Sequence, residues 1–161
     1  LSFSGHTHVM MNHELGAEHG YAPPGGTLHR HCNLTSTCGS WYRGPRDQAG
    51  IPYSPGRDGA PKGYARVRFE GASKYRIQFK ALGEDAALQL RVSLPDRVAR
   101  AALGETFAHV NVFNATPRTA VRLRVDGGAW TPLERVFAHD PFYLALRERR
   151  AEGVEGDHAV L

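Results

Sequence analysis

The stretch from Gly63 to Lys80 decides the fold of this chain, because it holds two runs of alternating residues separated by a turn. Gly63–Phe69 has the sequence GYARVRF, and Lys74–Lys80 has the sequence KYRIQFK. In both runs an aromatic or aliphatic side chain alternates with a basic or polar one, which is the pattern of a half-buried strand. The intervening Glu70–Ser73 includes a glycine, so the two runs are predicted to form a hairpin.

Similar runs continue toward the C-terminus. We expect further strands over 88–94, 107–113, 119–125 and 130–136, with turn signals between them. This spacing favours an antiparallel β-sandwich. A helix is predicted to begin at Asp140 and Pro141, with Asp140 as its cap. The predicted fold class is therefore mainly β: an antiparallel sandwich-like domain with one short helix near the C-terminus.

Composition sets broad limits on the function. The 161 residues suit one domain, or one domain and a short remnant of another. The formal charge is +4, but the basic residues are spread along the chain and form no basic stripe with interleaved aromatics, so we expect no nucleic-acid partner. The sequence contains no apolar run of about 18 residues that would predict a membrane span. Cys32 and Cys38 are compatible with buried thiols, a disulfide or metal ligands, and two cysteines do not define a compartment.

A long irregular segment precedes the regular part of the chain. Arg43–Pro61 is rich in glycine and proline turn signals and is predicted to be an irregular surface segment. Irregular segments of this length are uncommon unless they carry a function or cover another part of the protein. The preceding stretch, Leu28–Trp41, mixes polar and apolar residues and is a candidate strand.

Histidines are concentrated at the start of the chain. Of the nine histidines, six lie in the first 31 residues: His6, His8, His13, His19, His29 and His31. Histidines used only for packing would not be expected to gather in this way. The first 31 residues are therefore predicted to form one wall of a site.

The motif Gly5-His6-Thr7-His8 follows a short apolar stretch that is typical of the end of a strand. Two histidines separated by one residue can face two neighbouring metal ions, and neutral imidazole suits manganese, iron and zinc. The spacing alone leaves open the alternative that His6 and His8 are polar loop residues.

The residues around this motif resemble a known family. Ser4–His8 is similar to the closing Gly-His-x-His motif of calcineurin-like metallophosphoesterases. Four further segments resemble the region that follows the catalytic domain in a bacterial subgroup of these enzymes, where a β-rich domain is fused to it: CGSWYRG (38–44), DGAPKGY (58–64), NVFNA (111–115) and VDGGAW (125–130). The resemblance covers most of the chain.

This resemblance implies a division of the chain and a set of roles. Residues 1–31 would be the end of an α/β phosphoesterase domain, and 32–161 a β-rich C-terminal accessory domain. His6 would ligate one of two divalent ions, of the manganese, iron or zinc class, and His8 the other. The parent enzyme would hydrolyse a phosphomonoester or phosphodiester by a metal-bound hydroxide. His29, Arg30 and His31 would lie near the catalytic mouth and contact the substrate phosphate, unless they are only outward polar residues of a strand.

Other metal motifs of the family do not occur in the chain, namely Asp-x-His, Gly-Asp-x-x-Asp and Gly-Asn-His followed by an acidic residue. We therefore expect the remaining catalytic domain to lie upstream as the docking partner, the two metal ions not both to be retained, and the isolated chain to be inactive. The alternative is a stand-alone β-sandwich module that binds carbohydrate or protein. That alternative predicts Trp41, Tyr42 and Trp130 exposed on one face.

Overall fold

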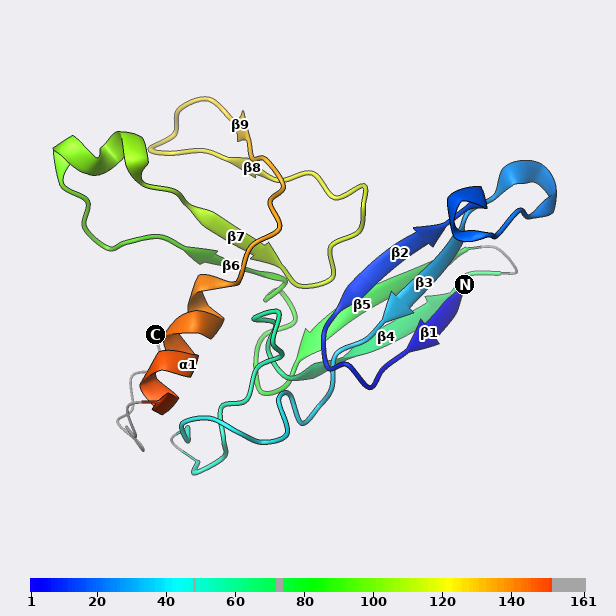
Figure 1. The fold of residues 1–161 in the computed structure, drawn as a ribbon, viewed down its shortest axis with the longest axis horizontal. Coiled ribbons are helices and arrows are strands. Elements are labelled where there is room, and N and C mark those ends of the chain that lie inside the picture. Colours follow the sequence, from blue (N-terminus) through cyan, green and yellow to red (C-terminus); the bar gives the residue numbers. More distant parts are fainter. Residues whose placement is uncertain (48, 72–73, 152–161) are drawn as a thin grey trace.

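Strands dominate the computed structural model, which describes residues 1–47, 49–71 and 74–151 (Figure 1). The strands are β1 Ser2–Ser4, β2 Met11–Leu15, β3 His29–Asn33, β4 Gly63–Phe69, β5 Tyr75–Ala81, β6 Leu90–Ser93, β7 His109–Val112, β8 Arg122–Leu123 and β9 Thr131–Pro132. Short 3-10 turns cover Ala17–His19, Pro24–Gly26 and Arg100–Glu105, and the α-helix α1 covers Pro141–Ala151. The predicted class, mainly β with one short helix near the C-terminus, is confirmed.

The hairpin predicted first in the sequence is formed by β4 and β5. The two strands pair antiparallel, with Phe69 opposite Tyr75 and Gly63 opposite Ala81. β4 has the predicted bounds, and β5 is displaced by one residue from its prediction. Phe79 and Ala81 on β5 are completely buried, so alternating polarity correctly identified the side of the hairpin that packs inward.

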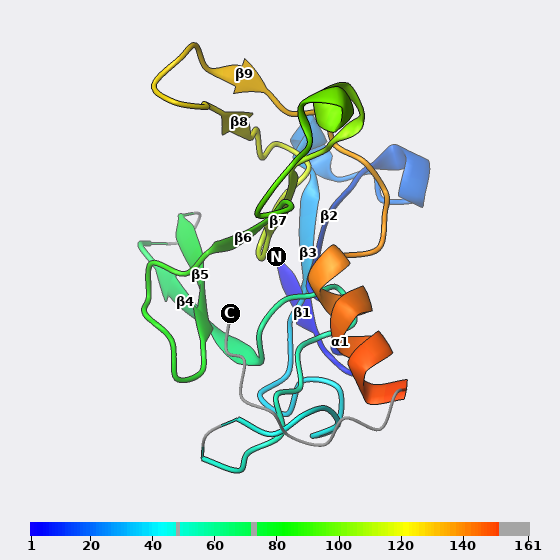
Figure 2. The same ribbon diagram turned by 90° about the vertical axis from the view of Figure 1, so that its left-hand side faces the viewer.

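A second sheet lies across from this hairpin; the two overlap in the view of Figure 1, and Figure 2 shows them as separate layers. Its strand order is β1-β3-β2, with β3 parallel to β1 and antiparallel to β2. The Arg30 guanidinium bridges the layers, 5.8 Å from the centre of the Tyr75 ring. The sequence did not predict β2, and the proposed boundary between residues 31 and 32 falls inside β3. The division into domains stays a prediction.

The core is small and draws on distant parts of the sequence. Its buried members are Ala60, Phe79, Ala81 and Phe113, with Met10 packed against them. The rings of Phe79 and Phe113 meet edge to face, with 5.8 Å between centroids. Burying one such side chain stabilises the fold by about 1.5–3 kcal/mol. Ala60 belongs to the irregular segment, so that segment is part of the core and not merely a surface loop.

The C-terminal hairpins are shorter than the alternation predicted. β6 pairs with β7 and β8 with β9, both antiparallel, but β8 and β9 each have only two residues. Val125, Val136 and Phe137 remain largely exposed. Because a two-stranded ribbon needs a packed face to extend, alternation without a partner layer gives only short pairing.

The helix α1 begins as predicted. The Asp140 carboxylate accepts a hydrogen bond from the Tyr143 backbone N–H at 2.8 Å, and Pro141 occupies the first helical position. The Arg91 guanidinium stacks on Phe142, 3.7 Å from the ring centre, and ties the helix to β6. No helix in the described ranges has the length and apolar character required to cross a membrane.

Candidate functional site

The Gly-His-x-His loop leaves the carboxyl end of β1. Gly5 of this loop does not have a positive φ, and a Cβ there would meet nothing within 4 Å. Instead, His6 and His8 take the left-handed conformation, with φ of 76° and 57°. Non-glycine residues adopt this conformation at a cost, and such strain persists only where surrounding contacts hold it.

The ring of His8 is held by the segment that follows β3. Its Nδ1 donates to the Gly39 carbonyl at 2.5 Å and lies 3.9 Å from the Cys38 thiol. The Trp41 indole stacks on the imidazole, with centroids 4.4 Å apart and planes 26° from parallel. His6 is exposed. The structure thus places His6 and His8 on one loop, with only His8 strongly constrained.

Two polar residues, the buried Asn33 and the half-buried Asp58, hold the backbone on either side of His8. The Asn33 amide donates to the Thr7 hydroxyl at 2.6 Å and to the Val9 carbonyl. The Asp58 carboxylate accepts the Met10 backbone N–H at 2.7 Å. Burial raises the pKa of Asp58; the hydrogen bonds it accepts oppose this shift, and the nearby Asp140 carboxylate adds to it.

Sequence reasoning predicted Asp58 only as a turn residue. It does make a turn, since one carboxylate oxygen accepts the Ala60 N–H at 3.1 Å. The other oxygen reaches Met10, 48 residues earlier in the chain. An Asp-Gly pair signals the turn, but no local pattern signals this second contact.

The three candidate substrate residues on β3 do not share a face. Side chains alternate along a strand, so His29 and His31 point to one side of the sheet and Arg30 to the other. On the histidine side, the Ser2 hydroxyl bonds both imidazoles, each at 2.8 Å, and His13 stacks near His31 with centroids 6.3 Å apart. His29 and His31 are therefore brought together, and Arg30 is separated from them.

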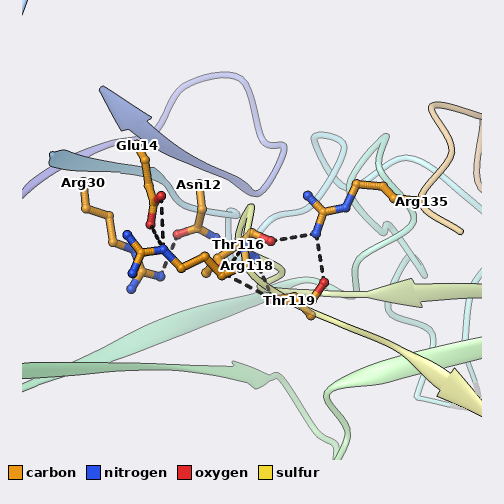
Figure 3. A network of polar contacts seen from close by, with 7 residues as sticks. All are labelled: Asn12, Glu14, Arg30, Thr116, Arg118, Thr119 and Arg135. Carbon is orange, nitrogen blue, oxygen red and sulfur yellow. Dashed lines mark hydrogen bonds and ion pairs between the residues drawn. The ribbon is translucent and has the colours of Figure 1, made fainter. Parts of the chain in front are cut away.

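Arg30 belongs to a polar network between the β1-β3-β2 sheet and the C-terminal part of the chain, from β6 onward (Figure 3). Its guanidinium donates to the Asn12 side-chain oxygen at 3.0 Å. The Asn12 amide in turn donates to the Asn114 side chain at 3.0 Å and to the Ala115 carbonyl at 2.8 Å. Together with the stacking on Tyr75, these bonds give Arg30 a role in joining the sheet to the C-terminal part.

The outer part of the same network is more exposed (Figure 3). Glu14 pairs with Arg118 at 3.0 Å, and Arg135 donates to the carbonyls of Thr116 and Thr119 at 2.8 and 3.1 Å. Solvent-exposed pairs of this kind contribute about 0–1 kcal/mol each. The Glu14–Arg118 pair joins β2 to the C-terminal part and adds little to stability, whereas the Arg135 bonds lie within the C-terminal part.

The described residues do not by themselves form a metal centre. No group of three or more histidine, cysteine or acidic side chains that could hold an ion occurs within the described ranges. Cys32 and Cys38 are unbonded thiols, and burial raises the pKa of Cys32 despite the opposing charge of Arg30. His6 and His8 thus fit only part of a centre, because divalent transition metals in proteins usually take three or four protein ligands.

Comparison with known proteins agrees with the resemblance seen in the sequence. A family model described as the C terminal of calcineurin-like phosphoesterase matches residues 31–159. The chain therefore belongs to this family of phosphoesterase C-terminal regions, and its origin is related to the phosphoesterases. No curated protein and no solved structure matches the chain. The matched segment, 31–159, includes Asn33, Gly39 and Asp58, which hold the histidine loop.

Proposed function

We propose that this chain is the C-terminal part of a metal-dependent phosphoesterase, and that its Gly-His-x-His loop supplies two ligands to a dinuclear metal centre. His6 ligates one ion and His8 the other, and carboxylates from a preceding catalytic domain complete the centre. One observation carries the proposal furthest. The histidine loop leaves β1, in the sheet whose central strand is β3, and is held by residues of the segment that matches the phosphoesterase family.

In this proposal residues 1–31 end the catalytic domain and 32–161 form the accessory domain. The bound ions, of the manganese, iron or zinc class, would neutralise the charge of a phosphomonoester or phosphodiester. We keep His29 and His31 as candidate phosphate contacts, since both are only half-buried and share the face of the sheet opposite Arg30. Arg30, the third candidate, is occupied by Asn12 and Tyr75 on the opposite side.

The isolated chain is expected to be inactive, because two imidazoles do not hold two divalent ions against water. The test compares the 161-residue chain with a version extended upstream in its own reading frame, using p-nitrophenyl phosphate and its diester with manganese or zinc. The extended protein should turn over and lose activity with His6→Ala or His8→Ala. The matched control is His109→Ala, which alters an exposed histidine on β7, away from the loop and from β3.

Two results would contradict the proposal. One is metal-dependent turnover by the 161-residue chain itself. The other is an upstream sequence without the Asp-x-His and Gly-Asp-x-x-Asp motifs, which would leave His6 and His8 without carboxylate partners.

The alternative, a carbohydrate- or protein-binding module, is less well supported. Trp41, Tyr42 and Trp130 are all about half exposed, at 53%, 55% and 54%. However, the irregular segment around residues 40–60 and the β8–β9 hairpin lie at opposite ends of the molecule in both views (Figures 1 and 2). Aromatic side chains from these two segments do not build the single binding face that such a module requires.

A further inference from the structure

We propose that the family-matched segment positions His8 for metal binding: the Gly39 carbonyl and the Trp41 ring hold its imidazole with Nδ1 protonated and Nε2 unprotonated. This inference rests on the proposed function, because it concerns the ligand role of His8. In this proposal the β-rich accessory part orients one metal ligand of the histidine loop.

The hydrogen bond to Gly39 determines the tautomer. A carbonyl oxygen only accepts, so the His8 Nδ1 atom, 2.5 Å away, must carry the hydrogen. In the neutral ring, Nε2 then carries the lone pair, which is the form of imidazole that binds a metal ion. Metal-bound histidines commonly donate their other ring N–H to a backbone carbonyl, which fixes tautomer and orientation.

The position of the Gly39 carbonyl is itself fixed. Gly39 is buried and has a φ of 52°, and a Cβ at this position would lie 1.4 Å from the Ser54 carbonyl oxygen. Its N–H donates to the Ser36 carbonyl at 3.1 Å, and the neighbouring Ser40 hydroxyl donates to the Pro55 carbonyl at 2.7 Å. Only glycine fits where these two loop segments cross. The Gly39 carbonyl that faces His8 therefore has little freedom to move.

The Trp41 ring fixes the plane of the imidazole. Its centroid lies 4.4 Å from that of His8, although Trp41 remains 53% exposed. Burial alone therefore does not explain its location. Trp41 and Tyr42 also have left-handed backbones, with φ of 58° and 53°, a conformation unfavourable for aromatic residues. Strain at such positions tends to accompany functional constraint.

The backbone on both sides of His8 is held as well. Asn33 bonds to Thr7 and Val9, and Asp58 bonds to Met10. Because these hydrogen bonds fix the main chain, the hydrogen bond to the Gly39 carbonyl and the stacking of Trp41 only need to orient the His8 ring. Asn33, Gly39, Trp41 and Asp58 all belong to the segment that matches the family model.

The test is the nitrogen spectrum of the histidines in the metal-free, 15N-labelled chain, at a pH where imidazole is neutral. His8 is assigned by the loss of its signals in His8→Gln. We expect one His8 nitrogen at the position of an unprotonated imidazole nitrogen and the other, Nδ1, at that of an N–H. The exposed His6 serves as the internal comparison and should give averaged signals. A His8 with the hydrogen on Nε2, or averaged like His6, overturns the proposal.

A variant pair separates positioning from folding. Trp41→Leu should shift the His8 signals toward an averaged mixture while the rest of the spectrum stays folded, and Trp130→Leu should leave them unchanged. Unchanged His8 signals in Trp41→Leu would refute the role of that ring. The wild-type spectrum tests the Gly39 bond even if the variant does not fold.

A titration of the protein extended upstream with cobalt(II), followed by the His6 and His8 signals, separates this proposal from the proposed function. If Nδ1 carries the hydrogen and His8 binds cobalt, Trp41→Leu should weaken that binding about tenfold. If the tautomer is as expected but cobalt broadens neither His6 nor His8, positioning holds and the metal-ligand role fails. If cobalt binds and the tautomer is wrong, the positioning role fails and the ligand role stands.

Discussion

The irregular segment 37–62 has little sequence periodicity but several buried residues, whereas segment 119–137 has clear alternation but little burial. Segment 37–62 contains few regular elements, yet Ser54, Ala60 and the backbone of Gly39 are buried in it. Segment 119–137 has the alternation of two strands, yet it forms only two-residue pairs and leaves Val125 exposed. The first is specified by buried hydrogen bonds and close contacts, whereas the second has alternation without a layer to pack against.

Of these two segments, the one with the weaker periodicity therefore has more buried residues and more contacts to the histidine loop. Segment 37–62 holds the histidine loop and contributes to the core. Its substitutions should therefore be costly, and those in 119–137 should be tolerated. Substitutions in and around these segments should therefore differ widely in their effect on stability.

Phe79→Ala should destabilise the chain most, by about 3–5 kcal/mol, because it empties the core on which Ala60 and Phe113 pack. The matched control is Phe137→Ala, which removes a fully exposed ring and should change stability by less than about 0.5 kcal/mol. Urea unfolding of both variants measures the difference. Equal losses would show that the core lies elsewhere.

Gly39→Ala should cost about 2–4 kcal/mol, because it adds a clash with the Ser54 carbonyl to a left-handed backbone. Gly104→Ala is its control: a Cβ there meets nothing within 4 Å and the φ is not positive, so the change should be neutral or slightly stabilising. Thermal unfolding compares the two. A tolerated alanine at 39 would break the contrast between the segments.

Asp58→Asn should destabilise the chain at neutral pH by about 1–3 kcal/mol, because both carboxylate oxygens accept backbone N–H groups. An amide keeps one acceptor and turns an NH₂ group toward the other donor. Chemical denaturation measures the loss, and Asp126→Asn, in an exposed turn, is the control.

The same variant carries a pH signature. Burial raises the pKa of Asp58 in the folded chain above its ordinary value of 3.8. Between the ordinary pKa of the unfolded chain and the raised pKa of the folded chain, the folded state binds more protons than the unfolded state. The contribution of Asp58 to stability therefore falls as pH rises. The stability difference between wild type and Asp58→Asn should therefore shrink as pH increases through that window. A difference that grows instead would mean that the pKa is lowered.

The smallest effect is expected for the exposed pair Glu14–Arg118. Removing it should cost no more than about 1 kcal/mol, and the cost should decrease with added salt. A double-mutant cycle with Glu14→Gln and Arg118→Gln isolates the pair. A coupling well above this value would make the network in Figure 3 a major attachment between the two parts.

The sequence predicted the elements that have local causes. Alternation against a buried layer located β4 and β5, and the Asp140-Pro141 pair located the start of α1. It could not predict β2, whose residues find their partners on β3 about twenty residues later. Alternation also overestimated β8 and β9, since a period of two does not reveal whether a facing layer exists.

The candidate site was predictable only in part. The Gly-His-x-His spacing predicts His6 and His8 as ligands, which stays a prediction. It did not indicate that Gly39 and Asp58 would hold their loop from 31 and 48 residues away. Likewise, the run His29-Arg30-His31 suggested one cluster, whereas strand geometry divides it between two faces. These contacts depend on tertiary structure, which no local pattern encodes.

The most direct test of the account is metal content per polypeptide, measured after gel filtration by elemental analysis. The chain extended upstream should retain two divalent ions, and His6→Ala and His8→Ala should each lose about one of them, while the 161-residue chain should not retain both. Two ions held tightly by the 161-residue chain, or two retained in both variants of the extended protein, would contradict the account.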